Sequence, residues 1–413
     1  MLIKPLSLVR AKVIPLVGGN TVRLLVNGTD FFPAILKAIN NAQVEIRLET
    51  YIFFDDVTGQ AVRDALTQAA TRGVRVYVLT DGIGCRTLCP TFFTPLQNAG
   101  GQLQVFRADR NLFALNRGRL RRTHRKLIVV DERIGFVGGI NIIDDFTDSL
   151  SEHPRFDYAV QVEGPILLQI HAAMLKLWRS ASMLRRLQAK LGRTSSADAD
   201  TSSSAASPAL PLPSPLPTAI GGDTLAAFIE RDNVRHRRAI ERSYLFAFLT
   251  AKKSILLCNP YFLPGHKLRR ALRHAAKRGV KITILLPGLL DHPLLKLATE
   301  ALYPQLLGAN MVIAEYIKSM LHGKAAVVDG EWSTVGSSNL DPFSLFLNRE
   351  ANIVIKDAKF AAELTASIQH AIDHDAVLVN PEEWARRSWW QRAKAWMAYG
   401  LSRVMGRTLG IGD

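Results

Sequence analysis

Cysteine is scarce in this chain of 413 residues, and it occurs only at Cys85, Cys89 and Cys258. An odd number of cysteines gives no disulfide framework and is typical of a reducing compartment. Cys85 and Cys89 have the spacing of half a metal site, but no matching Cys/His pair follows them in the sequence. We therefore interpret the three as ordinary buried thiols.

Long apolar runs are missing as well. No run reaches the roughly 18 residues that a membrane-spanning helix needs. The N-terminal stretch 1–19 is interrupted by Lys4, Arg10 and Lys12, and no small-residue cleavage site follows it. We expect neither a transmembrane helix nor a signal peptide, so any membrane contact should be peripheral.

Acidic residues are outnumbered, with 36 Asp and Glu against 52 Lys and Arg, which gives a formal net charge of +16. Such an excess indicates an anionic partner, either nucleic acid or an anionic membrane. Hydrophobic residues make up 48% of the chain, which excludes a wholly disordered protein. The length predicts two or three domains.

A composition shift divides the chain. Residues 193–222 are rich in Ser, Ala and Pro, which predicts a linker between a first domain, 1–192, and a second, 223–380. The halves repeat one another, because RDALTQAATRGVRVYVLTDG at 63–82 parallels RRALRHAAKRGVKITILLPG at 269–288. Each segment predicts a helix that ends near a glycine and is followed by a strand. Further strands are expected over 44–54 and 254–262. Strands alternating with amphipathic helices predict an α/β fold, with helices on both faces of a sheet.

The repeat is strongest in two segments that share the spacing H-x-K-x4-D-x6-G, with an asparagine shortly after. The members are His124, Lys126, Asp131 and Asn141 in the first half, and His322, Lys324, Asp329, Ser337 and Asn339 in the second. Residues two apart on a strand share a face, so each His and Lys should point the same way. The small-residue turn before each Asn lets backbone and amide approach a phosphate. A lone histidine is usually structural, but duplication of the whole set in register argues for a function.

These segments resemble the paired HKD motifs of the phospholipase D superfamily. The stretches NGTDFFPAILKAI, LETYIFFDD, NPYFLPG and GSSNLDPFSLFLNREANIVI are similar to those of bacterial cardiolipin synthases, most closely the B type without transmembrane helices. The resemblance covers about residues 20–380. It implies two phospholipase D-like α/β/α sandwich domains related by a pseudo-two-fold axis, with one active site at their interface.

The sequence shows neither a P-loop nor an acidic metal-binding cluster, so the histidines and lysines must organise any phosphodiester chemistry. One neutral imidazole attacks phosphorus, while the other, protonated, donates to the leaving alkoxide. Family analogy favours His124 as the nucleophile, with His322 as the alternative. Lys126, Lys324, Asn141, Asn339 and Ser337 would hold the phosphate oxygens. No metal or other cofactor is expected.

Two acids, Asp157 in FDYAVQV and Glu350 in NREANIVI, open corresponding strands after the motifs. They resemble the acids that orient the histidines in this superfamily, and the alternative is surface charge at a strand start. Asp131 and Asp329 belong to the catalytic motif. Their position beyond the buried strand indicates that they brace the site instead of touching substrate.

Arginines crowd the approach to His124, which suits an anionic lipid pair and a nucleic-acid backbone equally well. They are Arg110, Arg117, Arg119, Arg121, Arg122 and Arg125. Because aromatics do not interleave them as in a single-strand-binding groove, we expect no nucleic-acid partner.

The tail, 381–413, is rich in tryptophan. Trp389, Trp396, Met397, Leu401 and Val404 fall near helical spacing, and residues 384–413 hold six basic residues against one acid. This pattern predicts a peripheral anchor on an anionic leaflet, and the alternative is a helix that packs on the core.

The resemblance implies transfer of a phosphatidyl group from one phosphatidylglycerol to another through a phosphohistidine, with cardiolipin and glycerol as products. Phosphatidylethanolamine stays open as a donor. The alternatives are a hydrolytic phospholipase D or nuclease and a non-catalytic membrane scaffold. We expect a peripheral protein on the cytoplasmic face of a bacterial membrane, and the sequence leaves its oligomeric state open.

Overall fold

The computed structural model describes residues 15–108, 121–146, 152–190, 222–289 and 293–408. The predicted linker, apart from its last residue, Gly222, lies outside the described residues. Of the three cysteines only Cys258 is buried, whereas Cys85 is half-buried and Cys89 exposed. The expectation of three buried thiols was therefore wrong, because Cys85 and Cys89 lie in the loop that follows a strand and not within the sheet.

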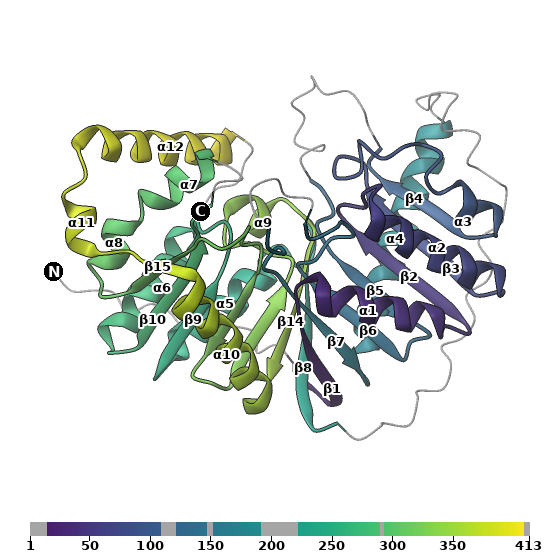
Figure 1. The fold of residues 1–413 in the computed structure, drawn as a ribbon, viewed down its shortest axis with the longest axis horizontal. Helices are drawn as coiled ribbons and strands as arrows, with labels where there is room; N and C mark the ends of the chain where they lie inside the picture. The colour runs from purple at the N-terminus through teal and green to yellow at the C-terminus, as the bar shows by residue number, and fades with distance from the viewer. Residues whose placement is uncertain (1–14, 109–120, 147–151, 191–221, 290–292, 409–413) are drawn as a thin grey trace.

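One mixed sheet of fifteen strands runs through both halves of the described chain (Figure 1). The strands of the first half are β1 (Val17–Val26), β2 (Glu45–Thr50), β3 (Arg75–Asp81), β4 (Gln102–Phe106), β5 (Leu127–Val130), β6 (Ile134–Gly138) and β7 (Tyr158–Glu163). Those of the second are β8 (Thr224–Arg231), β9 (Ser254–Cys258), β10 (Lys281–Pro287), β11 (Val312–Tyr316), β12 (Ala325–Val328), β13 (Trp332–Gly336), β14 (Glu350–Lys356) and β15 (Ala376–Leu378).

The strand order is symmetric about the contact between β1 and β8. Outward from it, the first half reads β1-β7-β6-β5-β2-β3-β4 and the second β8-β14-β13-β12-β9-β10-β11, with β15 added at the edge. Each strand of one half therefore has its counterpart at the same place in the other. This is the pseudo-two-fold relation that the duplicated sequence predicted.

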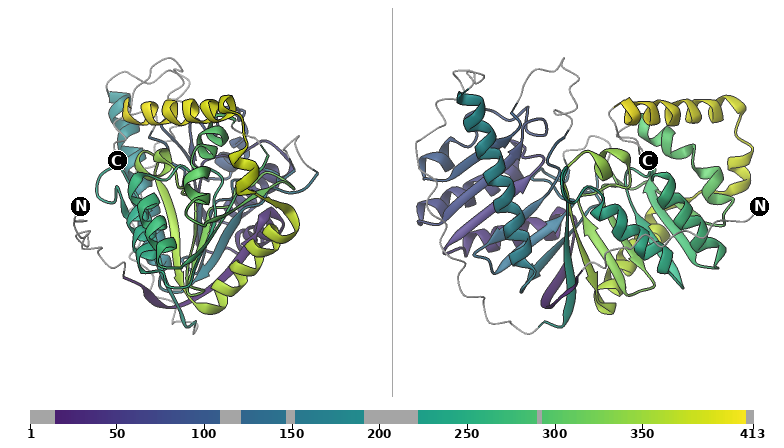
Figure 2. Two further views of the ribbon diagram at one scale, coloured as in Figure 1. Left: turned by 90° about the vertical axis from the view of Figure 1, so that its left-hand side faces the viewer. Right: turned by 180° about the vertical axis from the view of Figure 1, so that it is seen from behind.

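Helices cover both faces of each half-sheet (Figures 1 and 2). In the first half they are α1 (Asn27–Asn40), α2 (Val57–Thr71), α3 (Thr94–Asn98) and α4 (Leu167–Lys190). In the second they are α5 (Ala239–Thr250), α6 (His266–Lys277), α7 (Pro293–Glu300), α8 (Tyr303–Leu307), α9 (Pro342–Phe346), α10 (Ala358–Asp375), α11 (Pro381–Ala385) and α12 (Trp389–Thr408). Helices α1 and α2 pack on one face of the first half and α4 on the other. Helices α5 and α6 are opposed to α10 in the same way.

A single apolar core joins the halves. It combines side chains of α4 and of β5–β7 with side chains of α10 and of β12–β14, including Met174 and Phe360. Separate cores lie under α1 and α2 and under α5 and α6. Burial of apolar surface between the halves therefore fixes their relative position.

The repeated segments fold as predicted. Helices α2 and α6 end at Thr71 and Lys277, two residues before Gly73 and Gly279. The φ values of these glycines, +90° and +87°, suit glycine. Each helix leads into a strand parallel to its predecessor, β3 beside β2 and β10 beside β9. The strands expected over 44–54 and 254–262 end earlier, at Thr50 and Cys258, because the chain beyond them pairs only through isolated bridges.

The two H-x-K segments lie at one edge of the sheet. Strands β5 and β12 are antiparallel to β2 and β9, so the residues before β5 and β12 lie beside the carboxyl ends of β2 and β9. We call this side of the sheet the motif edge. Helices α7 and α12 lie on the same side, as Figure 1 shows. No helix in the described part of the chain is long and apolar enough to span a bilayer.

Candidate active site

Each motif histidine and lysine immediately precedes a buried strand. His124 and Lys126 lead into β5, and His322 and Lys324 lead into β12. The Nζ of Lys126 donates to the backbone oxygen of His124 at 2.9 Å, and Lys324 donates to the oxygen of His322. In both halves the lysine thus holds the backbone of its own histidine.

Backbone pairing between the halves sets the position of each histidine. The amide of His124 donates to the oxygen of Arg349 at 2.8 Å, and the amide of His322 donates to the oxygen of Phe156 at 2.8 Å. Arg349 directly precedes Glu350, and Phe156 directly precedes Asp157. Two short parallel bridges, Thr123 to Arg349 and Phe156 to Leu321, therefore bring an acid of one half beside the histidine of the other.

The histidine–acid pairs are crosswise. Nδ1 of His124 lies 3.1 Å from Oε2 of Glu350, and Nδ1 of His322 lies 2.5 Å from Oδ2 of Asp157. A carboxylate at Nδ1 favours the tautomer with the proton there, which leaves the Nε2 lone pair for a reacting atom. Neither half contains a complete histidine–acid pair, so the site needs both.

Burial makes both imidazoles neutral. It lowers the pKa of His124 below its ordinary value, and Glu350 opposes this only in part. Burial and the nearby Lys324 lower the pKa of His322 to about 3. Burial by itself raises the pKa of Asp157, but Lys324 and His322 lower it below its usual range, so this acid stays ionised. A neutral histidine beside an ionised acid, as in the pair of His322 and Asp157, suits nucleophilic attack and proton transfer.

The lysines of the two motifs act on one shared site. Burial, together with the nearby charge of Lys324, lowers the pKa of Lys126 to about 7, and the charge of Glu350 opposes this only in part. The charge of Lys324 also lowers the pKa of His124, and the charge of Lys126 lowers the pKa of His322. Two ammonium groups this close in a low-dielectric site favour an anion between them.

The three predicted phosphate ligands differ. Oδ1 of Asn141 accepts from the amide of Ile52 at 3.1 Å, which fixes the plane of its side-chain amide. Oδ1 of Asn339 is buried and lacks a partner within the described chain. Ser337 instead donates its hydroxyl to Glu350 at 2.5 Å, and its carbonyl lies 3.1 Å from Nδ1 of His124. Ser337 therefore positions the acid and the histidine, and its contact with phosphate stays a prediction.

The aspartates of the motifs lie at the opposite edge. Asp131 accepts the backbone amides of 43–45 at 2.8 Å each, and Asp329 accepts those of 252–254 at 2.7–3.0 Å. Each aspartate lies five residues along the strand from its lysine, a span of about 16 Å. They hold the starts of β2 and β9, in keeping with the expectation that these motif aspartates brace the site without touching substrate.

Two of the arginines near His124 hold the fold. Arg122 forms a buried pair with Asp81 at 2.7 Å, and Arg125 one with Glu49 at 2.6 Å. Because Arg125 lies between His124 and Lys126, it points to the other face of the strand. Their interpretation as substrate contacts is wrong for this reason. Arg110, Arg117 and Arg119 lie outside the described residues.

Sequence reasoning missed Tyr51. Its ring packs edge-on against that of His124, with the ring centroids 5.0 Å apart, and Nζ of Lys126 lies 5.5 Å from the centroid of the tyrosine ring. The second half has Pro260 at the corresponding position, so the two histidines differ in their surroundings. Tyr51 directly follows β2, and the signal was its place at the carboxyl end of a strand beside the motif.

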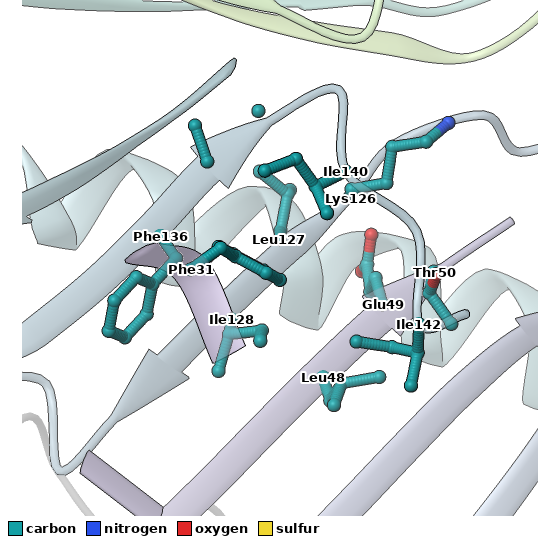
Figure 3. A pocket seen from close by; sticks show the side chains of 12 residues that line it. Phe31, Leu48, Glu49, Thr50, Lys126, Leu127, Ile128, Phe136, Ile140 and Ile142 are labelled. Atoms are coloured by element: carbon teal, nitrogen blue, oxygen red, sulfur yellow. The ribbon is translucent and has the colours of Figure 1, made fainter. Parts of the chain in front are cut away.

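An apolar pocket beneath the first motif belongs to the core. Its walls are mostly side chains such as Phe31, Ile128 and Phe136, with Glu49 and Thr50 at one border. Figure 3 shows the amine of Lys126 pointing away from these apolar walls. The amine of Lys126 therefore lies outside this apolar pocket.

Two duplicated half-sites, each histidine held by an acid of the other half, define the phosphodiester-transfer enzymes of the phospholipase D superfamily. A family model described as "Cardiolipin synthase, PLD-like domain" matches residues 35–174 and 245–372. Cardiolipin synthase B of Salmonella typhimurium is 37% identical over 385 residues, which covers 93% of this chain and 88% of that protein. The major cardiolipin synthase ClsA of Bacillus subtilis is 31% identical over 394 residues, with coverages of 94% and 76%. The chain thus belongs to the cardiolipin synthase family of phospholipase D-like enzymes.

A solved structure has the same fold. The phosphatidylserine synthase of Haemophilus influenzae matches with a TM-score of 0.69 at 14% identity, covering 97% of this chain and 98% of that one. At this identity the match supports the fold alone. It agrees with two phospholipase D-like α/β/α domains around one interface.

Proposed function

We propose that this enzyme transfers a phosphatidyl group from one phosphatidylglycerol molecule to another and thereby forms cardiolipin and glycerol. The observation that carries the proposal is the crosswise pairing, His124 with Glu350 and His322 with Asp157. It supplies two differently placed imidazoles on one phosphate site. The names of the relatives support the choice of lipid products.

In the first step, Nε2 of His124 attacks phosphorus, and the bond between phosphorus and the glycerol oxygen breaks. His322, protonated once the phosphate anion is bound, gives its proton to the departing oxygen. A nearby anion raises the pKa of an imidazole, which offsets the effect of burial on His322. Lys126, Lys324 and the two motif asparagines hold the non-bridging oxygens.

In the second step, the hydroxyl of another phosphatidylglycerol attacks the phosphohistidine. His322, now neutral, takes the hydroxyl proton while the bond between phosphorus and Nε2 of His124 breaks. The enzyme returns to its starting state with both protons accounted for. Water in place of the lipid hydroxyl would give hydrolysis, which is the competing fate.

We further propose that the enzyme works as a peripheral protein on an anionic membrane, at its cytoplasmic face. The net charge of +16 supports an anionic surface. In this proposal the first phospholipase D-like domain comprises residues 1–192 and the second residues 223–380.

The test is product analysis. The purified protein is incubated with phosphatidylglycerol vesicles, with and without phosphatidylethanolamine, and its lipids are identified by mass spectrometry. His124→Ala and His322→Ala should each abolish cardiolipin formation, whereas His370→Ala, an exposed histidine on α10, should not. Phosphatidic acid as the main product would support a phospholipase D instead. A phosphatidyl adduct trapped on His322 would reverse the histidine roles.

A further inference from the structure

Helix α12 turns its apolar face away from the protein. Its buried residues are small and lie on one side, Ala395, Ala398 and Ser402, at helical spacing. The opposite side is exposed and consists of large apolar side chains. They are Trp389, Trp390, Trp396, Met397, Leu401 and Val404, each at least 50% exposed.

This arrangement inverts that of an ordinary surface helix, which buries its large apolar residues. We call the six exposed residues the indole face. Trp384, in the preceding α11, packs on Tyr303 with ring centroids 4.7 Å apart and carries Arg387 over its other side. The tail is therefore docked firmly on the second half while the indole face stays open.

The position of α12 links the indole face to the active site. Helix α7 follows the carboxyl end of β10, where Lys296 donates to the oxygen of Pro287 at 2.6 Å. That end of β10 belongs to the motif edge, because β10 is parallel to β9. Helix α12 packs on α7, and the views of Figures 1 and 2 show it along this edge.

The first half contributes exposed apolar side chains to the same edge. Phe146, 56% exposed, follows the turn after β6, and Val57, 79% exposed, opens α2 just beyond the end of β2. Exposed apolar side chains from both halves therefore lie along the motif edge.

The charge beside the indole face indicates its occupant. Arg392 and Lys394 are exposed and border this face on opposite sides of α12, and Arg386 is exposed at the end of α11. Indole rings flanked by cations suit the headgroup boundary of an anionic leaflet. A second copy of this chain, with the same positive charge, would be repelled.

We propose that the indole face inserts into an anionic bilayer and so directs the motif edge at the lipid surface. The inference rests on the proposed function only in that the substrate is a lipid. Because the indole face and the motif edge lie on the same side of the molecule, a lipid headgroup would reach the paired histidines without leaving the membrane surface.

The test uses the full chain and vesicles of phosphatidylcholine with about one third phosphatidylglycerol. The triple variant Trp389→Gln, Trp390→Gln, Trp396→Gln should bind these vesicles at least about tenfold more weakly in co-sedimentation. The control is Val44→Gln with Val312→Gln, two exposed residues at the starts of β2 and β11, on the opposite edge. It should bind as the unchanged protein does. Thermal unfolding checks that both variants fold.

Two further readouts decide between occupants. Brominated lipids should quench the indole fluorescence of the unchanged protein on anionic vesicles, and this quenching should be lost in the triple variant. Its turnover on vesicles should fall relative to its turnover of a short-chain monomeric lipid. Equal vesicle binding by the triple variant would overturn the proposal. A dimer of the unchanged protein that the triple substitution dissociates, and the control substitutions do not, would overturn it as well. Tryptophan-dependent binding without any cardiolipin formed would keep the docking inference and refute the proposed function.

Discussion

At the scale of single residues, the site depends on which atoms the neighbours leave available. Glu350 is held by the hydroxyl of Ser337 and in turn holds Nδ1 of His124. The pair His322 and Asp157 repeats the contact of acid and Nδ1, although the backbone amide of Tyr158 and not a serine donates to Asp157. The acids act through the histidines, so they are positioning residues.

Glu350→Gln and Asp157→Asn should each lower kcat by on the order of 10²-fold or more, because the amide no longer fixes the tautomer or stabilises the imidazolium. The measurement is cardiolipin formation, with the phosphatidyl adduct quantified beside it. Glu363→Gln, an exposed glutamate on α10, is the matched control. Full activity in either positioning variant would contradict the crosswise pairs.

The titration of Lys126 predicts how kcat/KM depends on pH. Since burial lowers its pKa to about 7, the free enzyme loses this charge as pH rises through 7. We expect kcat/KM to fall about fiftyfold between pH 7 and pH 9, because the protonated fraction of a group with a pKa of about 7 falls by that factor while the phosphodiester keeps its charge. Lys126→Arg, always protonated, should move this descending limb to higher pH although its maximum is lower. An unmoved limb would assign the titration to another group.

At the scale of elements, the motif aspartates serve the turns at the far ends of β5 and β12. Asp131 and Asp329 both have positive φ values, 53° and 57°. Each accepts three backbone amides at the start of the neighbouring strand. The identical use in both halves explains why the motif repeats this residue although it lies far from the histidines.

Asp131→Asn and Asp329→Asn should therefore lower the free energy of unfolding by about 1–3 kcal/mol, because charge-assisted hydrogen bonds are lost. Asparagine tolerates the left-handed backbone, so no strain is added. Urea unfolding measures the loss, and turnover of the folded protein at 25 °C should change less than about twofold. Loss of turnover at unchanged stability would instead show that both aspartates act in catalysis.

At the scale of the whole molecule, the site exists only where two half-sheets meet. Arg125 links them, since it pairs with Glu49 on β2 at 2.6 Å and reaches Glu230 on β8 at 3.4 Å. It is almost fully buried, and its partner Glu49 is buried too.

Arg125→Met should destabilise the protein by about 3–5 kcal/mol, because it leaves Glu49 buried without its partner. The double variant Arg125→Met, Glu49→Leu should recover most of this free energy, since an apolar pair removes the buried charge. Urea unfolding compares the variants, with Arg242→Met at an exposed position of α5 as the control. A double variant no more stable than the single one would refute a charge-pairing role.

The sequence by itself determined the duplicated architecture. Helix-then-strand segments recur with the same spacing in both halves, and the buried strands at 127–130 and 325–328 follow each H-x-K segment as expected. Period and turn chemistry are local, so they are legible in a single chain. The candidate histidines, lysines and acids could be named for the same reason.

Tertiary structure decided what each side chain touches. Which acid meets which histidine depends on the bridges between the halves, and no spacing along the chain encodes them. Ser337 donates to Glu350 and Arg125 pairs with Glu49, and neither contact with an acid on another strand could be foreseen from the sequence. The tail shows the same limit. Its periodicity predicted an amphipathic helix, but only the small residues available for close packing on α7 determined that its tryptophans point outward.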